Sequence, residues 1–353
     1  MAILERLGVN LPLIQAPMAG TSTPLMAAEV SNAGALGSIA VGATDAAGAR
    51  AMIAEVRERT QRPFNVNLFV HPTPVADAER EAEWIEWLRP RFAEFGAEPP
   101  VALQSPYTSF ADDAEMLALL VEVAPPVVSF HFGLPSAEAI AALRERGIVL
   151  LATATNVEEA RVIEAAGIDG IVAQGIEAGG HRGMFDPAAP DTQLGTMALT
   201  RLLVRDTGLP VIAAGGIMDG AGIAAALDLG AEAAQLGTAF VGCPESAADE
   251  GYRAALMGAG AWHTTLTPLV SGRPARALAN RFTGLSAEVG DRRPPDYPIA
   301  YHAGKALNAA ARARGEYGFG AQWAGQGAPL ARAMPAAELV ATLMAELAVA
   351  QSR

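Results

Sequence analysis

The sequence contains a single cysteine, Cys243, among 353 residues. One cysteine can form neither an internal disulfide nor a cysteine-cluster metal site, and we expect no metal ion in this protein. Basic residues are also scarce, because 25 lysines and arginines stand against 38 aspartates and glutamates, for a formal net charge of −13. No block of basic residues occurs. The composition argues against nucleic-acid binding, which depends on neutralising phosphates.

Long apolar runs are absent as well. No stretch of about 18 consecutive apolar residues occurs, so we expect no membrane span and no membrane partner. The first residues, MAILERLGVNLPL, include the acidic Glu5 and no long apolar segment, which argues against a signal peptide. A cytoplasmic protein is the simplest interpretation.

The sequence is rich in apolar residues. Hydrophobic residues make up 51% of the chain and charged residues only 18%, which predicts a large and well-buried core. A chain of this length can form one large α/β barrel with a modest extension, or two ordinary domains.

Short apolar runs alternate with alanine-rich segments of helical periodicity, a pattern typical of buried parallel strands joined by helices. We expect strands at Leu13–Ala16, Leu36–Ala40, Phe64–Leu68, Val127–His131, Val149–Thr153, Gly170–Gln174, Val211–Ala214 and Ala234–Gly237. We expect helices at Thr23–Asn32, Asp45–Thr60, Ser136–Arg146, Val157–Ala166, Thr196–Thr207 and Gly220–Leu229. Eight such α/β units favour a closed (β/α)8 TIM barrel, and an open doubly wound sheet is the alternative.

The expected helix ends carry suitable residues. Asn156 and Asp219 occupy positions where a side chain caps a helix amino terminus. Glycines just past the carboxyl ends favour left-handed backbone that stops a helix. These are Gly34, Gly147, Gly167, Gly208 and Gly230.

The third crossover, at about 71–126, is too long for a simple connection. It contains helical patterns at Asp77–Phe95 and near Asp112–Val123, with Tyr107 in the loop between them. We treat this segment as an inserted helical part of a barrel that spans residues 1–260.

The tail, residues 261–353, begins as an irregular segment rich in proline, arginine and glycine. It ends in helical patterns near Tyr301–Arg314 and Pro335–Ala350. Because strands and apolar runs are few, we expect no separate core here. We predict a loop and helical cap that covers the barrel mouth and closes the substrate pocket.

Several polar or polarisable side chains follow predicted strands, at the end where barrels place their active sites. Pro17 fixes the turn after the first strand, and Met18 would then face the mouth, where its thioether suits a flat ring. Asn67 and Gln174 place amides at the ends of the third and sixth strands. A buried amide needs partners, which a heteroaromatic ring edge offers. The plain alternative for each is a core or capping role.

Two glycine turns follow the last two strands. Gly215 and Gly216 come after the seventh strand, and Gly237 and Thr238 after the eighth. Barrels often bind phosphate at these two loops, where glycines let the backbone approach the ligand and a hydroxyl adds a donor. The sequence therefore predicts a phosphate site, with two ordinary tight turns as the alternative.

The segment Ile171–Gly183, IVAQGIEAGGHRG, carries the strongest catalytic signal. Gly179 and Gly180 permit close backbone approach, and His181 supplies a group that acts as a base or as an electrostatic partner near neutral pH. His131 ends the fourth strand and is expected to line the same pocket. A solvated loop that merely turns is the alternative.

Tyr297, Tyr301 and Lys305 recur every four residues in the predicted cap. Residues 301 and 305 share a helix face, so an ammonium and phenols could receive a small anion at the mouth. A solvated lysine beside packing tyrosines is the plain alternative.

Several of these segments together carry a family resemblance that runs nearly end to end. They are QAPMAG, FNVNLF, VSFHFG, AQGIEAGGHRG, AAGGIMDG, QLGTAF and AQWAGQG. The chain resembles nitronate monooxygenase of class I, formerly called 2-nitropropane dioxygenase. The resemblance implies a TIM barrel that binds FMN and oxidises alkyl nitronates, such as propionate 3-nitronate, with O2 to a carbonyl compound and nitrite. It also implies one-electron chemistry through an anionic flavosemiquinone.

The resemblance also implies roles for individual residues. His181 matches the catalytic histidine. The residues that match the substrate pocket are Tyr107, Tyr297, Tyr301 and Lys305, with His131 added as a pocket residue. The residues that match flavin contacts are Met18, Asn67, Gln174, Gly179, Gly180, Gly215, Gly216, Gln235, Gly237 and Thr238, with Pro17 added beside Met18. The partners are then an anionic nitronate and O2, and the chain is a monomer or homodimer.

Three other functions remain open at this point. An FMN-dependent NAD(P)H reductase, acting on quinones or enoyl thioesters, would use the same barrel and flavin motifs. A flavin-binding barrel without catalytic activity would share them too. A barrel dehydrogenase of the inosine-phosphate type is disfavoured, because it needs a loop cysteine and Cys243 follows the eighth strand.

Overall fold

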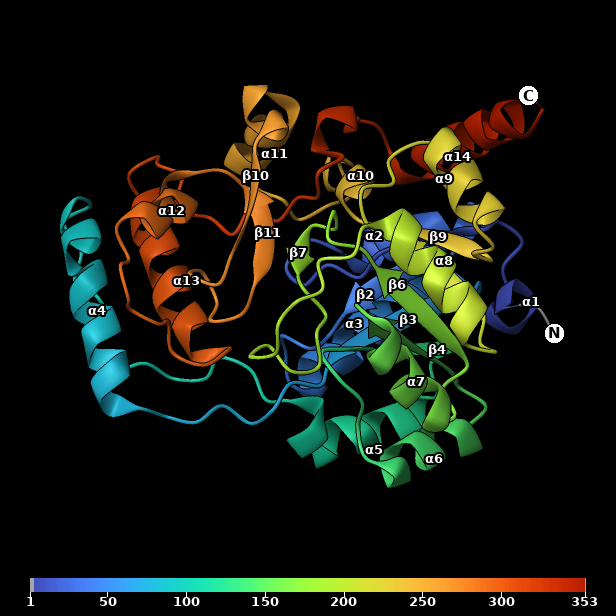
Figure 1. Cartoon of the computed structure of the whole chain (residues 1–353), viewed down its shortest axis with the longest axis horizontal. Helices are drawn as coiled ribbons and strands as arrows, with labels where there is room; N and C mark the ends of the chain where they lie inside the picture. The colour runs from blue at the N-terminus through green and yellow to red at the C-terminus, as the bar shows by residue number, and fades with distance from the viewer. Residues whose placement is uncertain (1–2, 353) are drawn as a thin grey trace.

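The computed structural model describes residues 3–352. Eight parallel strands form one sheet in the order β1-β9-β8-β6-β5-β4-β3-β2, and a parallel bridge between Ile14 and Leu36 joins its two edge strands. The sheet therefore closes, which confirms the TIM barrel over the open sheet (Figure 1). The strands are β1 (Leu13–Gln15), β2 (Gly37–Ala40), β3 (Phe64–Phe69), β4 (Val127–His131), β5 (Val149–Ala154), β6 (Gly170–Gln174), β8 (Val211–Ala214) and β9 (Ala233–Leu236).

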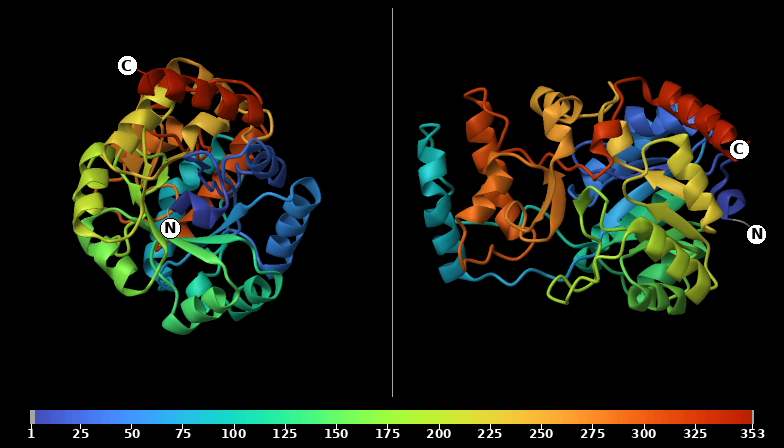
Figure 2. Two further views of the ribbon diagram at one scale, coloured as in Figure 1. Left: turned by 90° about the vertical axis from the view of Figure 1, so that its right-hand side faces the viewer. Right: turned by 45° about the horizontal axis from the view of Figure 1, so that its top comes forward.

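Helices surround the barrel as a ring, which is seen end-on in the left view of Figure 2. They are α2 (Pro24–Asn32), α3 (Ala46–Arg59), α5 (Ala114–Val123), α6 (Ala137–Glu145), α7 (Val157–Ala165), α8 (Thr196–Asp206), α9 (Gly220–Asp228) and α14 (Ala336–Gln351). The predicted strands and helices of the barrel are confirmed to within one or two residues at most ends. Strands β4, β6 and β8 match without any shift.

Helix α14 does not cover the barrel mouth, and the prediction that it belongs to the cap is wrong. It packs on the outside of the barrel against α9 and α2, through a shared apolar cluster that includes Leu339, Leu343, Ile223 and Met26. Its apolar stripe matches this groove, so the last helix of the chain completes the outer ring. The rest of the proposed division at residue 260 stays a prediction.

The amino end of the barrel is closed by α1 (Ile3–Leu7), which sequence reasoning did not predict. Ile3 and Leu7 are fully buried and belong to the cluster that fills the barrel interior, together with Ile14, Val172 and Ile212. The interior is thus a packed core, and only the carboxyl ends of the strands remain for a site.

Most predicted helix ends have the expected geometry. The side chains of Asn156 and Asp219 accept the backbone N–H groups of Glu159 and Gly222, so both are N-caps. Left-handed backbone occurs at Gly34, Gly147, Gly167 and Gly230. The prediction for Gly208 is wrong, because α8 ends at Asp206 and the following Thr207 has extended backbone, so no left-handed residue is needed.

A second lobe lies beside the barrel mouth, at the left of Figure 1. It combines the inserted helix α4 (Ala78–Ala93) with α13 (Ile299–Arg312) and the short α12 (Arg281–Gly284) of the tail. These elements share one apolar cluster that includes Trp84, Leu88, Phe282, Leu307 and Phe319. The tail thus contributes to a core that it does not form alone, because its apolar residues combine with those of a segment some 200 positions earlier.

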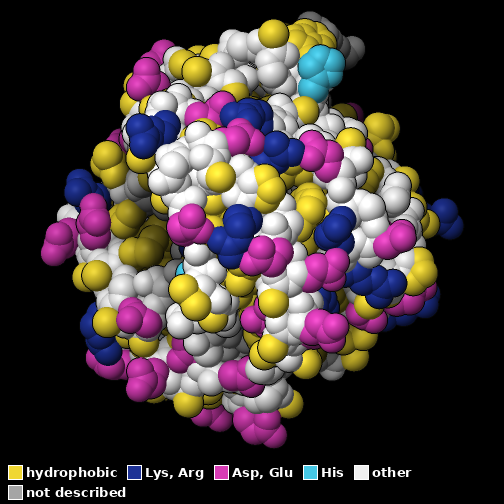
Figure 3. Space-filling model, turned by 90° about the vertical axis from the view of Figure 1, so that its left-hand side faces the viewer, with side chains coloured by type: hydrophobic (Ala, Val, Ile, Leu, Met, Phe, Trp, Pro, Cys, Tyr) yellow, Lys and Arg dark blue, Asp and Glu magenta, His cyan; other side chains and the backbone are white. Residues whose placement is uncertain are grey.

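Ion pairs also join α4 to the tail. They are Arg80–Asp296, Arg91–Glu288, Arg281–Glu94 and Arg292–Glu83. Figure 3 shows the face formed by this lobe, where basic and acidic side chains are interspersed. Each exposed pair contributes little by itself, so the apolar cluster holds the lobe together.

A small antiparallel sheet joins the lobe to the barrel, and sequence reasoning missed it. Its order is β10-β11-β7, with β7 (Gly180–His181) in the loop after β6, and β10 (Thr264–Thr267) and β11 (Ala275–Leu278) in the tail. Strand β7 has only two residues, too few to leave a periodic pattern. Further short elements are α10 (Thr238–Val241) and α11 (Glu250–Met257).

Within residues 3–352, the structure contains no helix with the length and apolar character needed to cross a membrane.

Substituting Leu88→Ala tests whether α4 and the tail share a core. Leu88 is fully buried in the second lobe, so we expect the free energy of unfolding of this lobe to fall by about 2–5 kcal/mol. All four tryptophans lie in α4 or the tail, so their fluorescence during urea unfolding reports on this lobe. The control, Leu202→Ala on the exposed face of α8, should change stability by less than about 0.5 kcal/mol. Equal effects of the two substitutions would contradict the shared core.

Candidate active site

A cavity of about 540 Å³ opens at the carboxyl ends of the barrel strands, between the barrel and the second lobe. Its size lies in the range of small-molecule and cofactor sites. Every residue that the sequence indicated for catalysis, substrate or flavin lines it. These residues are Pro17, Met18, Asn67, Tyr107, His131, Gln174, Gly179, Gly180, His181, Gly215, Gly216, Gln235, Gly237, Thr238, Tyr297, Tyr301 and Lys305. Their shared placement is an observation, and their individual roles stay predictions.

His181 is fixed at the cavity wall by backbone pairing with the tail. Its strand β7 pairs with β11, with His181 opposite Ala275, and the next residue, Arg182, donates its N–H to the Pro274 carbonyl at 2.8 Å. The imidazole Nε2 lies 2.8 Å from Oγ of Ser271, whose hydroxyl also lies 3.2 Å from the Arg273 carbonyl.

This arrangement assigns the tautomer of His181. A hydroxyl has one proton, so both contacts of Ser271 form together only if it donates to the Arg273 carbonyl and accepts from Nε2–H of His181. Nδ1 is then unprotonated, and it has no hydrogen-bond partner among residues 3–352. The free lone pair of His181 is available to a ligand.

Gln174 holds the loop that carries His181. Its Nε2 donates to the His181 carbonyl at 2.9 Å, and its Oε1 accepts the N–H of Gly183 at 2.7 Å. The sequence led us to expect a ring edge as the partner of this amide. Instead each end already has a protein partner, which leaves one N–H and one lone pair for a ligand.

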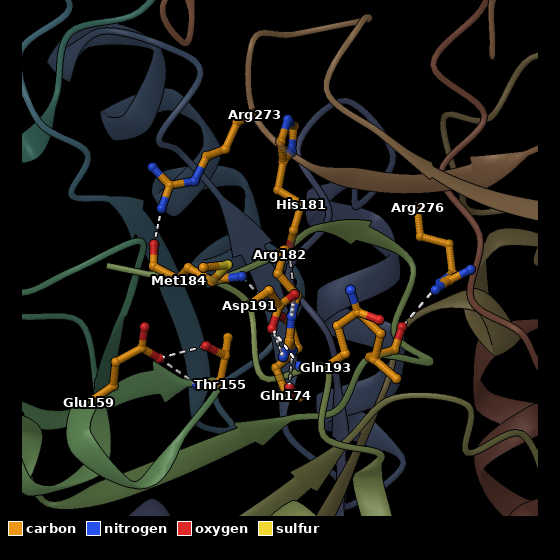
Figure 4. Close-up of polar contacts among 12 residues, drawn as sticks. Thr155, Glu159, Gln174, His181, Arg182, Met184, Asp191, Gln193, Arg273 and Arg276 are labelled. Carbon is orange, nitrogen blue, oxygen red and sulfur yellow. Dashed lines mark hydrogen bonds and ion pairs between the residues drawn. The ribbon is translucent and has the colours of Figure 1, made fainter. Parts of the chain in front are cut away.

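Buried charges reinforce the same loop, as Figure 4 shows. Arg182 forms an ion pair with Asp191 at 2.9 Å and donates to the Gln174 carbonyl. Arg276 of β11 donates to the Ile176 carbonyl at 3.1 Å. The loop is therefore a rigid support, although it contains several glycines.

His131 supports His181 from below. Its Nε2 lies 3.2 Å from the His181 carbonyl, which only accepts, so Nε2 carries the proton and Nδ1 accepts from the Thr153 hydroxyl at 3.0 Å. Both ring nitrogens are engaged, so only the ring face of His131 can meet a ligand.

Both imidazoles are neutral at pH 7. Burial, followed by the nearby His131 and Arg273, lowers the pKa of His181 to about 3. Burial also lowers the pKa of His131 to about 4, and the hydrogen bond to the His181 carbonyl opposes this shift only partly. A positive charge on either ring is disfavoured while the pocket holds no anion.

Aromatic rings and one lysine form the side of the cavity that the second lobe provides. The ring of His181 lies 5.2 Å from that of Tyr297, 6.3 Å from that of Tyr301 and 5.1 Å from that of Trp323. Burial raises the pKa of Tyr301 to about 12 and that of Tyr297 well above its ordinary value. Both phenols therefore keep their protons and remain hydrogen-bond donors.

Lys305 is the only lysine in the chain. Its ammonium lies 4.4 Å from the ring centre of Tyr107 and 5.1 Å from that of Tyr301, and it forms no ion pair with any of residues 3–352. The predicted shared helix face of residues 301 and 305 is confirmed by α13. The cavity therefore has an uncompensated cation at its edge.

The loops after β8 and β9 have backbone groups that suit a phosphate. Gly215 and Gly216 both have positive φ, which glycine adopts without strain. The N–H groups of Gly216 and Gly237 donate to no group within residues 3–352, and α10 begins at Thr238. Thr238 accepts the Gly325 N–H at 3.0 Å, which leaves its hydroxyl proton free. The donor set fits an anion.

Sequence reasoning missed several residues that line the cavity. Trp323, Gly325 and Gly327 lie in AQWAGQG, a segment that contributed to the resemblance without a role being given to its residues. Tyr252 of α11 also lines the cavity and donates to the Trp323 carbonyl. A lone tyrosine on an unpredicted helix leaves no signal in the sequence.

Comparison with known proteins decides the family. A family model described as nitronate monooxygenase matches residues 2–346. The chain belongs to the nitronate monooxygenase family. It is 62% identical to a nitronate monooxygenase of Paraburkholderia phytofirmans, over 98% of this chain and 94% of that relative. It is 57% identical to one of Pseudomonas aeruginosa, over 97% of both chains.

A solved structure of nitroalkane oxidase from Streptomyces ansochromogenes has the same fold. Its TM-score is 0.90 at 42% identity, and the match covers 100% of this chain and 99% of that one. The resemblance to the nitronate monooxygenase family inferred from motifs is thus confirmed. The NAD(P)H reductase alternative is not favoured, because the full-length relatives at 57–62% identity are nitronate monooxygenases.

The lowered pKa values of His131 and His181 predict a pH dependence of stability. In the unfolded chain both rings bind protons below about pH 6.5, whereas the folded protein resists them until about pH 4 or below. The free energy of unfolding should therefore fall as the pH drops from 7 to 5. In His131→Gln, where the amide keeps a donor for the His181 carbonyl, the loss per pH unit should be smaller. A slope unchanged by this substitution would contradict the assignment for His131.

Proposed function

We propose that the protein is an FMN-dependent nitronate monooxygenase, which oxidises alkyl nitronates with O2 to a carbonyl compound and nitrite. One observation carries the proposal most strongly. A lone lysine, protonated phenols and backbone N–H groups without partners among residues 3–352 meet in one cavity beside the neutral His181. The lysine, the phenols and the backbone N–H groups offer positive charge and hydrogen bonds to a small anion, whereas the unprotonated Nδ1 of His181 can only accept a hydrogen bond.

The cavity fits FMN. The loops of Gly215, Gly216, Gly237 and Thr238 would hold its phosphate through backbone N–H groups and one hydroxyl. Met18, Asn67, Gln174, Gly179, Gly180 and Gln235, with Pro17, line the remaining wall where the ring would lie. When bound, the flavin supplies the redox chemistry between the nitronate and O2.

Around the flavin site, the protein binds and orients an anion. Lys305 contributes positive charge from the edge of the cavity, and the Tyr107, Tyr297 and Tyr301 phenols act as donors that stay protonated. A nitronate carries its negative charge on the nitro oxygens, which these donors recognise. Propionate 3-nitronate, with a second anionic group, is the substrate we expect.

His181 decides which form of the substrate is used. With a pKa of about 3, its imidazole is a weak base, so removing the α-proton of a neutral nitroalkane is unfavourable. A nitronate has already lost that proton and needs only to be oriented. His131 acts through its hydrogen bond to the His181 carbonyl and holds the loop in place.

The first experiment combines a spectrum with oxygen uptake. The purified protein should be yellow with bound FMN and consume O2 with propionate 3-nitronate. His181→Asn should retain FMN and lower kcat/KM for the nitronate, because the substrate loses the ring that orients it beside Tyr297 and Tyr301. His263→Asn, at an exposed position outside the cavity, is the matched control and should behave as wild type.

Three results would contradict the proposal. A colourless protein that does not take up FMN would show that the activity does not depend on a flavin. Rapid anaerobic bleaching by NADH, without nitronate oxidation, identifies the reductase. A yellow protein that consumes no O2 with any of a panel of nitronates identifies a flavin-binding barrel without catalytic activity.

Lys305 offers a sharp test of anion binding. Lys305→Met should raise KM for propionate 3-nitronate on the order of tenfold with a smaller change in kcat, whereas Lys305→Arg should keep most of the affinity. Because the chain has no other lysine, reductive methylation of wild type labels only this side chain and the amino terminus. The NMR signal of the methylated amine should shift on adding the nitronate. A KM unchanged in Lys305→Met would remove this residue from substrate binding.

A further inference from the structure

Arg273 is a buried cation for which the function described so far has no use. Its side chain is 1% exposed, yet no carboxylate of residues 3–352 lies within ion-pair distance of the guanidinium. Its Nε has no hydrogen-bond partner in the part of the chain that the structure describes. Arg182, which is also buried, forms an ion pair with Asp191 at 2.9 Å. Burying an unpaired charge is costly, so the position of Arg273 needs an explanation.

The guanidinium lies against an aromatic ring that also touches both histidines. The guanidinium carbon is 4.2 Å from the ring centre of Phe132. The Phe132 ring lies 4.5 Å from that of His131, 5.7 Å from that of His181 and 5.3 Å from that of Tyr297. One phenylalanine therefore separates the buried cation from the imidazoles.

Phe132 adopts a backbone conformation that is unusual for its residue type. Its φ is +79°, in the left-handed region that a bulky side chain rarely occupies. Such strain persists where the surroundings over-determine the conformation, and it is common at functional sites. Here the strained backbone places the ring between the Arg273 guanidinium and the two imidazoles.

Arg273 also holds the loop that carries His181. It donates an N–H to the Met184 carbonyl, three residues after His181, and its own carbonyl accepts from the Ser271 hydroxyl that fixes the histidine tautomer. Figure 4 shows the side chain beside His181 with the guanidinium directed toward Met184. The same residue thus contacts the loop through its side chain and the tautomer-fixing serine through its backbone.

We propose that Arg273 is a positioning residue, which holds the His181 loop and supplies a permanent positive charge behind the two imidazoles. The guanidinium stacks on Phe132 and forms no ion pair with a carboxylate of residues 3–352. The carboxylates of Glu159 and Asp186 lie beyond ion-pair distance and offset its charge only in part, so its field extends to the imidazoles. An anionic ligand is then stabilised without a protonated histidine. This inference rests on the proposed function in naming a nitronate as the anion.

The charged and titratable groups that face His181 are few. They are His131 of β4, Arg273 of the turn before β11, Tyr297 before α13 and Tyr301 within it. Of these, Arg273 carries the permanent charge, and Arg182 is a second cation that acts on His131. Removing the Arg273 charge should therefore make both imidazoles easier to protonate, and this charge already contributes to the lowered pKa of each.

The experiment uses the FMN-loaded protein and three variants. Arg273→Met removes the charge but keeps much of the side-chain volume, and Arg273→Lys keeps the charge but loses the planar stack on Phe132. Arg276→Met is the matched control, because Arg276 is also buried and also binds a carbonyl of this loop, at Ile176. Readouts are the histidine NMR signals from pH 3 to 8, which includes the pKa values of both wild-type rings, amide exchange at residues 181–185, and KM and kcat for propionate 3-nitronate.

We expect Arg273→Met to raise the pH at which the His131 and His181 signals titrate and to raise KM on the order of tenfold, with a smaller change in kcat. Arg273→Lys should restore the wild-type titration and KM, while amide exchange at residues 181–185 stays faster than in wild type. Arg276→Met should leave the histidine titration unchanged. The signals are assigned with His131→Gln and His181→Asn.

A histidine titration in Arg273→Met that matches wild type would overturn the proposal. If Arg273→Met does not fold, Arg273→Lys still tests the proposal. This variant keeps the charge, so a histidine titration or a KM that differs from wild type would contradict a role based on charge. The histidine titration can be measured whether or not the protein oxidises nitronates. If the wild type fails to oxidise nitronates but the titration shifts as expected, the proposed function fails and the role of Arg273 stands.

Discussion

The backbone pairing between β7 and β11 is the interaction on which the active site depends. It joins a two-residue strand in a barrel loop, Gly180–His181, to a strand almost a hundred residues later in the chain. Without it His181 would sit on a glycine-rich loop with no defined orientation. With it, the histidine backbone is fixed from the tail side and by Gln174 from the barrel side. The second lobe therefore helps to fix the position of His181 in the cavity wall and does more than cover it.

The imidazoles and phenols at the site are neutral, and its positive charge comes from permanent cations. Burial keeps the imidazoles of His131 and His181 neutral and the phenols of Tyr297 and Tyr301 protonated. Permanent positive charge comes instead from lysine and arginine side chains, which burial does not neutralise at pH 7. A site built this way binds an anion without taking up a proton, and that suits a substrate that arrives already deprotonated.

The sequence predicted the barrel well and the lobe poorly, for a physical reason. Barrel strands such as Gly170–Gln174 form from local apolar runs, so a periodic pattern reveals them. The lobe depends on an apolar cluster whose members, such as Trp84 and Phe282, are distant in sequence, and on strands as short as Gly180–His181. Cavity residues that lie in recognisable motifs could be predicted from the sequence. The position of Tyr252 at the cavity and the burial of the Arg273 charge could not, because both depend on the three-dimensional structure.

The packing of α4 against α13 sets the order in which the molecule can be completed. During synthesis the apolar face of α4, with Trp84 and Leu88, emerges some 200 residues before its partners on α13. The barrel also lacks α14 until the chain ends. The nascent protein must therefore carry an unsatisfied apolar surface through most of translation, and Gly325 and Gly327 at the cavity emerge near the end. The cavity between the barrel and the second lobe is consequently complete only in the finished chain.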